Sequence, residues 1–309
     1  MKKVIGIGET ILDILFKDGK PVKAVPGGST FNSMISLGRM GMNVSFISEV
    51  GNDKVGKMIL DMLHDSGVET SSVCCFSDGK SPLSLAFLNE KNDAEYLFYK
   101  DYPNNRLEVD FPIINADDVV VYGSYFVLNP VLRSKTKSFL EYARERGAIL
   151  YYDINFRKNH IDERVKLAEA LIENLEFADI VRGSSEDFEN LYRLNDATAV
   201  YKEKIKFYSP NFICTGGAGS VKLFTKGGEK EYTPNKVDVV STVGAGDNFN
   251  AGVVYGILSS GITRDELYSM SQESWDKVMR CGLDFSSHAC TSLDNYVSKE
   301  WAMEYKKSR

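Results

Sequence analysis

Short apolar runs alternate with amphipathic stretches along most of this 309-residue chain. Runs of this kind predict strands that are buried on both faces. We expect strands at 4–8, 44–50, 117–125, 148–154, 179–183, 212–217 and 237–242. Because stretches with a helical pattern lie between them, the alternation favours an α/β fold with a mainly parallel sheet covered by helices.

Three of the intervening stretches predict helices. Residues 30–41 and 53–67 each begin at a capping residue and end at a glycine. A third helix is expected over 162–177, with Asp162 as its N-cap. Spacings of three and four residues give this third helix an apolar face of Val165, Ala168, Ile172 and Leu175.

Two segments interrupt the alternation and have no helical period. Segment 11–25 contains the turn signal KDGK, and segment 81–101 reads as a hairpin that turns at NEKND. Both are expected to pair into a small accessory sheet over one edge of the main domain. A further hairpin is predicted over 221–233, turning at Gly227–Gly228.

Composition narrows the function classes. The net charge is −6 and no basic block occurs, which argues against a nucleic-acid binder. No segment approaches 18 uninterrupted apolar residues, so no membrane span is expected. The first apolar run is broken at once by glycine and glutamate, unlike a signal peptide. Five cysteines without a CxxC spacing and three scattered histidines argue against a zinc site, and a cytoplasmic location is expected.

The stretch STVGAGDNFNAG, residues 241–252, joins an apolar run to a predicted helix through a glycine-rich loop. Unpaired N–H groups at a helix N-terminus favour anions, and glycines let a phosphate approach the backbone closely. Asp247 then reads as a base for a hydroxyl that attacks phosphorus. The N–H groups of Gly244, Ala245, Gly246 and Asp247 would stabilise the transferred phosphoryl group. The alternative is a glycine turn in which Asp247 simply caps the helix.

A second glycine pair, in PGGSTFNSMISLGRMG (26–41), also leads into a helix. Gly27 and Gly28 offer backbone groups, and Asn32 lies early in the helix, where its amide can reach outward. Asp13 follows the first strand. Together these groups suit a polyol, although a glycine turn with ordinary caps explains the pattern as well.

These motifs together resemble the PfkB, or ribokinase-like, family of carbohydrate kinases over nearly the whole chain. The matching segments are GETILDI (8–14), GGSTFN (27–32), VGNDKVG (50–56) and TVGAGDNF (242–249). The last is similar to the family signature T-x-G-A-G-D-x-F, which is highly specific. A dinucleotide-binding fingerprint fails because Ile11 occupies the position of its last glycine, and no P-loop motif occurs.

The resemblance implies a ribokinase-like, doubly wound, mostly parallel sheet with helices on both faces, plus a small β lid. Residues 1–10, 26–80 and 106–309 would form the main domain, and 11–25 with 81–105 the lid. ATP and Mg²⁺ are the implied cofactors, in an in-line transfer to a sugar hydroxyl. Asp247 is the implied base and Gly244 to Gly246 the anion hole, while Asp13, Gly27, Gly28 and Asn32 would bind the sugar.

The resemblance also assigns the nucleotide side. In FICTGGAGSV (212–221), Gly216 and Gly219 match the glycines of the nucleotide-binding turn, and Thr242 belongs to the signature near the nucleotide. Cys214 stands where threonine is usual, unless the register shifts by one residue. In YDINFR (152–157), Asn155 and Arg157 are implied near the phosphates and substrate, and Asp153 near the metal.

Three departures from the family pattern alter these expectations. Ser241 replaces the aspartate that helps to hold a monovalent cation, which predicts weak or absent potassium dependence. In RGSSEDFENL (182–191), Ser184 stands at the asparagine of the N-x-x-E segment, and the resemblance implies that it contacts the cofactor. Glu186 and Asp187 then supply its carboxylates for the metal, or Ser184 and the acids simply start a helix. The tail 286–301 lacks the usual Gly-Ala step, so the adenine pocket is not assigned.

The substrate expectation comes from the lid. EYLFYKDYPNN (95–105) resembles the F-Y-R stretch of fructokinases and ketodeoxygluconate kinases, with Lys100 in place of arginine. A neutral sugar needs few cations, so fructose is favoured. The alternatives are a ribokinase, a 2-keto-3-deoxygluconate kinase, or a catalytically impaired sugar-binding relative. Alternating Leu83, Leu85 and Phe87, together with alternating Tyr96 and Phe98, permit a homodimer formed through the lid.

Overall fold

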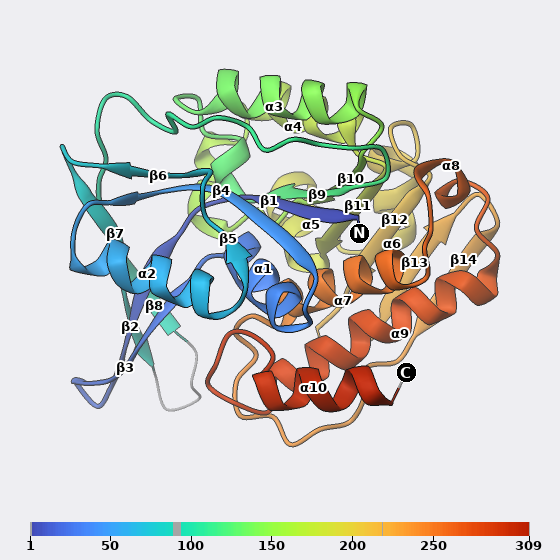
Figure 1. Cartoon of the computed structure of the whole chain (residues 1–309). Coiled ribbons are helices and arrows are strands. Elements are labelled where there is room, and N and C mark those ends of the chain that lie inside the picture. Colours follow the sequence, from blue (N-terminus) through green and yellow to red (C-terminus); the bar gives the residue numbers. More distant parts are fainter. Residues whose placement is uncertain (1, 89–93, 218, 309) are drawn as a thin grey trace.

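A ten-stranded sheet runs through the centre of the molecule in the computed structural model, which describes residues 2–88, 94–217 and 219–308 (Figure 1). The strand order is β14-β13-β12-β11-β10-β9-β1-β4-β5, with β6 paired to β4. Pairing is parallel from β12 to β5, and β13 and β14 form an antiparallel hairpin at one edge. The strands are β1 (Lys3–Ile7), β4 (Asn43–Gly51), β5 (Val68–Glu69), β6 (Val73–Phe76), β9 (Val119–Gly123), β10 (Ile149–Asp153), β11 (Ile180–Ser184), β12 (Asn211–Thr215), β13 (Val221–Thr225) and β14 (Gly228–Tyr232).

Helices cover both faces of this sheet, which confirms the doubly wound arrangement. One layer contains α1 (Ser29–Arg39), α2 (Lys54–Asp65), α7 (Ala245–Ser259), α9 (Gln272–Ala289) and α10 (Lys299–Lys307). The opposite layer contains α3 (Arg133–Glu145), α4 (Ala168–Phe177), α5 (Ser185–Tyr192) and α6 (Ala197–Val200). The remaining helical turns are α8 (Arg264–Leu267), the 3₁₀ turns η1 (Tyr125–Val127) and η2 (Lys158–Glu163), and the π turn η3 (Tyr201–Ile205).

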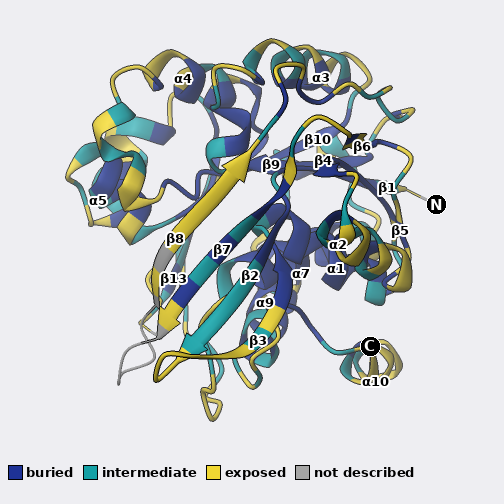
Figure 2. Cartoon of the chain, turned by 90° about the vertical axis from the view of Figure 1, so that its left-hand side faces the viewer, coloured by how far each residue is buried: buried dark blue, intermediate teal, exposed yellow. Residues whose placement is uncertain are grey.

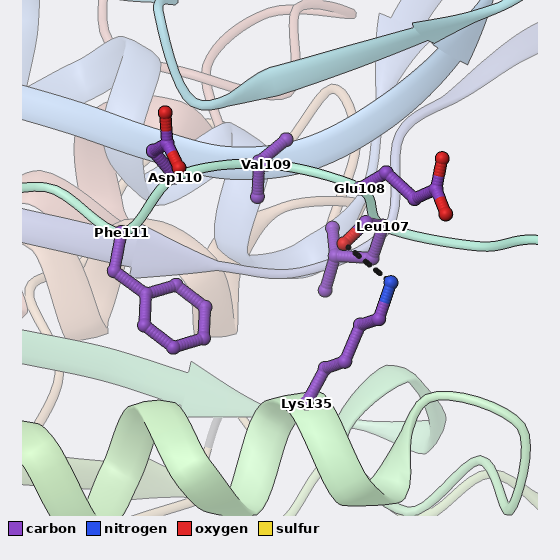
Figure 3. Close-up of a pocket in the computed structure, with 6 residues that line it drawn as sticks. All are labelled: Leu107, Glu108, Val109, Asp110, Phe111 and Lys135. Carbon is purple, nitrogen blue, oxygen red and sulfur yellow. Dashed lines mark hydrogen bonds between the residues drawn. The ribbon is translucent and has the colours of Figure 1, made fainter.

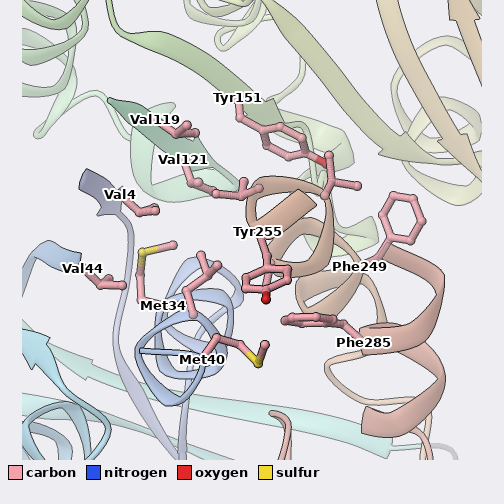
Figure 4. Packing of buried hydrophobic residues seen from close by; sticks show 14 of the residues in the cluster. Val4, Met34, Met40, Val44, Val119, Val121, Tyr151, Phe249, Tyr255 and Phe285 are labelled. Carbon is pink, nitrogen blue, oxygen red and sulfur yellow. The ribbon is translucent and has the colours of Figure 1, made fainter. Parts of the chain in front are cut away.

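The apolar strands divide their side chains between the two layers. In β9, Val119 and Val121 belong to the core beneath α1 and α7, whereas Val120 and Tyr122 belong to the core beneath α3 and α4. Successive side chains of a strand point to opposite faces, so a strand covered on both sides must be apolar throughout. Figure 4 shows the first of these cores, where Met34 of α1 lies between its helix and the strands and the ring of Tyr255 of α7 faces Phe285 of α9.

Helix α7 packs unusually close to its neighbour α9. A β-carbon at Gly252 would lie 2.3 Å from the carbonyl oxygen of Cys281, and one at Gly256 would lie 2.9 Å from Cα of Val278. Small residues on α7 therefore set the distance between the two helices. This contact fixes the axis of the helix whose N-terminus carries the glycine-rich loop.

The two segments that interrupt the strand–helix alternation supply every strand of a separate four-stranded sheet, in the order β3-β2-β7-β8. Its strands are β2 (Ile11–Lys17), β3 (Lys20–Gly27), β7 (Lys80–Leu88) and β8 (Ala94–Asp101). Asp18 and Gly19, with φ of 51° and 72°, make the tight turn between β2 and β3. Figure 2 shows this sheet projecting from the main body, with much of β8 exposed. The predicted turn at 89–93 lies outside the described residues.

Two predicted elements are wrong. Residues 237–242 are not a strand, because β14 ends the sheet and the chain runs outside it; Val239 is 61% exposed there. The helix predicted over 162–177 begins only at Ala168, after the 3₁₀ turn η2 that contains Asp162. Its buried face is also different: Leu171 and Leu175 are buried, whereas Val165 and Ile172 are exposed. The hairpin at 221–233 is confirmed.

No helix in the part of the chain that the structure describes is both long enough and apolar enough to cross a membrane.

Candidate active site

The glycine-rich loop ends where α7 begins. Gly244 is the N-cap of α7 with φ 78°, a left-handed conformation that favours glycine. A β-carbon there would also lie 2.5 Å from the carbonyl oxygen of Asn295. The Ala245 N–H donates to the Thr242 carbonyl, but the N–H groups of Gly246 and Asp247 have no partner among the described residues. The start of this 15-residue helix therefore presents free donors to an anion.

Asp247 meets the other glycine motif directly. Nδ2 of Asn32, on α1, donates to Oδ2 of Asp247 at 2.8 Å, and Oγ of Ser33 donates to the Asp247 carbonyl at 2.7 Å. Ser36 is bound in the same way to Asn248, at 2.5 Å. The first turns of α1 and α7 are thus joined side by side, and two sequence-predicted groups of residues form one site.

Burial governs the ionisation of Asp247. Loss of solvent raises the pKa of its carboxyl group to about 6, and the negative charge of Asp153 acts in the same direction. The Asn32 amide and the positive charges of Arg157 and Arg182 oppose this rise. The carboxylate is therefore ionised at neutral pH but basic enough to take a proton.

Asp13 approaches the same place from the small sheet. A β-carbon at Gly27 would lie 2.8 Å from Oδ2 of Asp13 and 3.8 Å from Oδ1 of Asn32, so all three surround one small space. The Ser84 hydroxyl donates to Asp13 from the neighbouring strand β7. Burial raises the pKa of Asp13 to about 6; the Ser84 bond lowers it, and the charge of Glu9 raises it slightly.

Lys100 reaches the main domain from β8 and forms an ion pair there. Its Nζ lies 2.6 Å from Oε1 of Glu9, which also accepts a 2.8 Å hydrogen bond from the Tyr102 hydroxyl. The pattern of residues gave no sign that Glu9 would pair with the lid lysine. Lys100 therefore carries a charge that is already balanced within the protein.

The segment after β10 supplies a second buried group. Asp153 accepts from Arg182 Nη1 at 3.0 Å and from Asn250 Nδ2 at 2.7 Å, so both of its oxygens are engaged. Asn155 is buried with φ 39°, a strained position for a residue other than glycine. Arg157 is exposed at the start of η2, and its charge lowers the pKa of Asp247.

The predicted nucleotide and metal residues lie on neighbouring strand ends. Gly216 and Gly219 form an exposed turn after β12, closed by a 3.1 Å backbone bond, and Thr242 is exposed beside Gly244. The metal role of the β11–α5 segment stays a prediction. Ser184 is the N-cap of α5 and forms a reciprocal capping box with Asp187, while Glu186 is exposed. No cluster of three metal-ligating side chains occurs in the described residues.

Sequence reasoning missed three buried members of the site, which are Arg182, Thr215 and Asn250. Arg182 interrupts the apolar strand DIVRG, and this is the one signal that could have identified it. Asn250 follows Asp247 by three residues on the same face of α7. Thr215 was considered only as a register alternative, but its hydroxyl accepts from Arg182 Nη2 at 2.8 Å.

A hollow of about 450 Å³ lies elsewhere, between the 107–111 segment and Lys135 of α3 (Figure 3). None of the residues discussed above lines it. The Lys135 side chain extends across the hollow, and its ammonium group donates to the carbonyl groups of Arg106 and Leu107. The hollow is therefore separate from the site around Asp247.

Comparison with known proteins identifies the family of this chain. The model of the pfkB family carbohydrate kinases matches residues 1–301. The sequence is similar to probable fructokinase-6, chloroplastic, of Arabidopsis thaliana, at 28% identity over 268 residues, covering 81% of this chain and 69% of that protein. It is also similar to 5-dehydro-2-deoxygluconokinase of Geobacillus thermodenitrificans, at 27% identity over 246 residues, covering 75% and 72%.

The fold is similar to that of a fructokinase double mutant from Vibrio cholerae O395, solved in its fructose-, ADP- and potassium-bound form. The TM-score is 0.84 at 19% identity, with 99% of this chain and 98% of that chain covered. Since the family model spans nearly the whole chain, the protein belongs to the pfkB family of carbohydrate kinases and is a phosphotransferase with an alcohol group as acceptor.

Proposed function

We propose that this sugar kinase transfers the γ-phosphoryl group of ATP to a hydroxyl of a neutral ketohexose, with fructose as the first choice. The observation that carries the proposal is the Asn32–Asp247 hydrogen bond, because it joins the residue proposed to bind the sugar to the proposed base. The similar Vibrio cholerae protein contains fructose and ADP in its structure, which supports this pair of ligands.

Asp247 acts as the general base in this proposal. Its carboxylate accepts the proton of the sugar hydroxyl as the hydroxyl oxygen forms a bond to the γ-phosphorus and the bond from that phosphorus to the β,γ-bridging oxygen breaks. The free N–H groups of Gly246 and Asp247 stabilise the charge on the phosphoryl oxygens during transfer. Gly244 lets the chain enter α7 in the left-handed conformation that exposes these donors.

The sugar is held between the lid and α1. Oδ1 of Asn32 is buried and has no hydrogen-bond partner among the described residues, because Nδ2 faces Asp247. A buried acceptor without a donor is costly, so a sugar hydroxyl would satisfy it. Asp13 accepts a second hydroxyl, and Gly27 has no side chain that would crowd the Asp13 carboxylate, from which a β-carbon would lie only 2.8 Å away.

The balanced charge of Lys100 favours a neutral sugar. Glu9 neutralises the lysine that a sugar acid would use for its carboxylate, and Asp13 adds a negative charge nearby. The similarity to 5-dehydro-2-deoxygluconokinase makes a deoxyketo sugar acid the second candidate. Arg157, exposed beside the site, is a cation that such a carboxylate could meet.

Magnesium would be bound with the ATP phosphates. Mg²⁺ usually keeps several waters and takes only one or two protein carboxylates, so the absence of a three-ligand cluster among the described residues fits this ion. Glu186 is exposed and Asp187 lies at the first turn of α5, and these residues would hold the ion. When bound, Mg²⁺ neutralises phosphate charge.

The monovalent-cation site departs from that of relatives that need potassium. Ser241 supplies a hydroxyl, which accepts from the Val243 N–H at 3.2 Å, where relatives supply a carboxylate. A serine has no charge to offset a potassium ion, so activity should depend little on potassium. The similar Vibrio cholerae fructokinase is described with a bound potassium ion.

The lid also supplies a dimer contact in this proposal. Strand register places apolar side chains together on the sheet face opposite Asp13 and Ser84. These residues are Ile14, Phe16, Leu83, Leu85, Phe87, Leu97 and Tyr99. Such a face is covered most simply by the same face of a second subunit. Light scattering should give a dimer for the wild type and a monomer for Leu97→Glu, with exposed Val165→Glu as the control.

The substrate proposal is tested by ATP consumption across fructose, ribose, glucose, 2-keto-3-deoxygluconate and 5-dehydro-2-deoxygluconate. Fructose should give the highest kcat/KM. A higher value for either sugar acid would replace fructose with that class. Wild-type protein that binds fructose but consumes no ATP with any of these sugars would identify an impaired relative.

The five cysteines are all free, which supports a cytoplasmic location.

A further inference from the structure

A buried arginine lies directly beneath the loop that is proposed to receive the phosphoryl group. Arg182, near the end of β11, has only 6% of its surface exposed. Its Nη1 donates to Asp153 on β10 and its Nη2 to Thr215 on β12, while Nε has no acceptor among the described residues. A charged group is rarely buried to this extent unless it is paired, and Asp153 is its partner here.

The guanidinium group packs against Gly246. A β-carbon at Gly246 would lie 2.8 Å from Nη2, 3.1 Å from Nη1 and 3.3 Å from Cζ of Arg182. Gly246 is not among the residues with positive φ, unlike Gly244. The two glycines therefore have different reasons to be glycine: Gly244 for its backbone conformation, and Gly246 for contact with the arginine.

A line of hydrogen bonds fixes this cation relative to α7. Thr215 accepts from Arg182, Arg182 donates to Asp153, and Asp153 accepts from Asn250 of α7. The Tyr151 hydroxyl donates to Asn250 at 2.9 Å and completes the line. Three adjacent strand ends are thereby connected to the helix that carries Asp247, so the loop and the base move as one body.

Arg182 is also the only cation among the buried groups at this point of the described structure. Asp153, Asp187 and Asp247 are all buried around it, and each would repel a phosphoryl group. Asp187 is turned toward the start of α5 by its bonds to Ser184. Without Arg182, the buried ionisable side chains described beneath the loop would all be carboxyl groups.

We propose that Arg182 is a positioning residue of phosphoryl transfer: it supports Gly246, orders the loop at the start of α7, and offsets the carboxylates so that the loop accepts a negatively charged group. This inference rests on the proposed roles of Asp247 and the Gly244–Gly246 loop. Arg182 acts through its neighbours and not by contact with the sugar. Replacing it should therefore lower kcat and leave the affinity for the sugar nearly unchanged.

The test compares Arg182→Met and Arg182→Lys with Arg264→Met, which removes an arginine from another buried aspartate, Asp179. Steady-state kinetics with the best sugar should show kcat lowered about 100-fold in Arg182→Met, the size expected when anion-hole stabilisation is lost. Arg182→Lys should recover part of this loss because it keeps the charge. Arg264→Met should keep kcat even if its Tm falls.

Two further measurements separate this role from a general loss of structure. In calorimetry, Arg182→Met should bind the sugar and ADP with Kd values within about threefold of the wild-type values. The same variant should bind ADP with aluminium fluoride, which mimics the transferring phosphoryl group, about 100-fold more weakly than the wild type does. The acidic limb of kcat/KM should move to higher pH, because Arg182 lowers the pKa of Asp247.

An unchanged kcat in Arg182→Met would overturn the inference. So would a loss of kcat matched by an equal loss of sugar binding with an unmoved pH profile. If the methionine variant does not fold, Arg182→Lys carries the same measurements, since a single ammonium nitrogen cannot reproduce the planar fork that contacts Asp153, Thr215 and Gly246 together. Failure of the proposed function looks different: the wild type itself would then show no sugar-dependent turnover, or Asp247→Asn would retain it.

Discussion

Asn32 and Asp247 are 215 positions apart in the sequence, yet the amide of one donates a 2.8 Å hydrogen bond to the carboxylate of the other. The bond engages Oδ2 of Asp247 and leaves Oδ1 of Asn32 buried without a hydrogen-bond partner among the described residues. It also lowers the pKa of Asp247, against the larger effect of burial. One amide thus positions the base, moderates its pKa and leaves an acceptor for the substrate.

Asp247→Asn should abolish turnover and stabilise the fold at neutral pH. The folded-state pKa of about 6 lies above the ordinary value of 3.8, so Asp247 stabilises the fold only while protonated. That stability is present below about pH 4 and lost as pH rises to about 6, a cost of about 3 kcal/mol for a shift of two pKa units. Asparagine avoids this cost and keeps an acceptor for Asn32.

Thermal unfolding at pH 7.5 and pH 4 checks this expectation. The gain of Asp247→Asn should be large at pH 7.5 and nearly absent at pH 4. Asp61→Asn, at an exposed carboxylate paired with Lys57, is the matched control and should change stability by about 0.5 kcal/mol or less. An equal gain at both pH values would show that charge burial is not the cause.

The pH profile of the enzyme should fall on the acidic side. Asp247 and Asp13 both have a pKa of about 6, and both must be ionised, one to accept a proton and one to accept a sugar hydroxyl. The logarithm of kcat/KM should therefore decline below about pH 6 with a slope that approaches two. Asp13→Asn should reduce that slope to about one. A profile that stays flat down to pH 5 would contradict the assignment of Asp247 as base.

The pairing of Glu9 with Lys100 should control the charge of the accepted sugar. Glu9→Gln leaves the lysine charge free, so KM for 2-keto-3-deoxygluconate should fall about tenfold relative to KM for fructose, the value of one charge-assisted hydrogen bond. Glu9→Gln combined with Lys100→Met is the control, since it removes both charges and should cancel the gain. A constant ratio of the two KM values in all variants would mean that the pair does not select the substrate.

The strands and helix starts that depend on local residue patterns could be predicted from the sequence. Apolar runs such as 4–8 and 148–154 became strands because both faces of the sheet are covered, and the loops around Gly27 and Gly244 became helix starts. The run at 237–242 also contains three valines, but the sheet had already ended at β14, which the segment itself does not indicate. Arg182 was missed for the same reason: its partners lie on three other elements.

Ser241→Asp should create potassium dependence. The present serine hydroxyl is turned to the Val243 N–H, and the Ser241 N–H is directed to the Cys290 carbonyl at 3.3 Å. An aspartate at the same position would add the charge that relatives use for the cation, so turnover of the variant should rise several-fold on replacing sodium with potassium. Wild-type turnover should be nearly the same in both salts. Ser241→Asn, equal in size but uncharged, is the control, and activation of that variant would show that charge is not the deciding property. Strong activation of the wild type would instead mean that backbone carbonyl groups alone hold the ion.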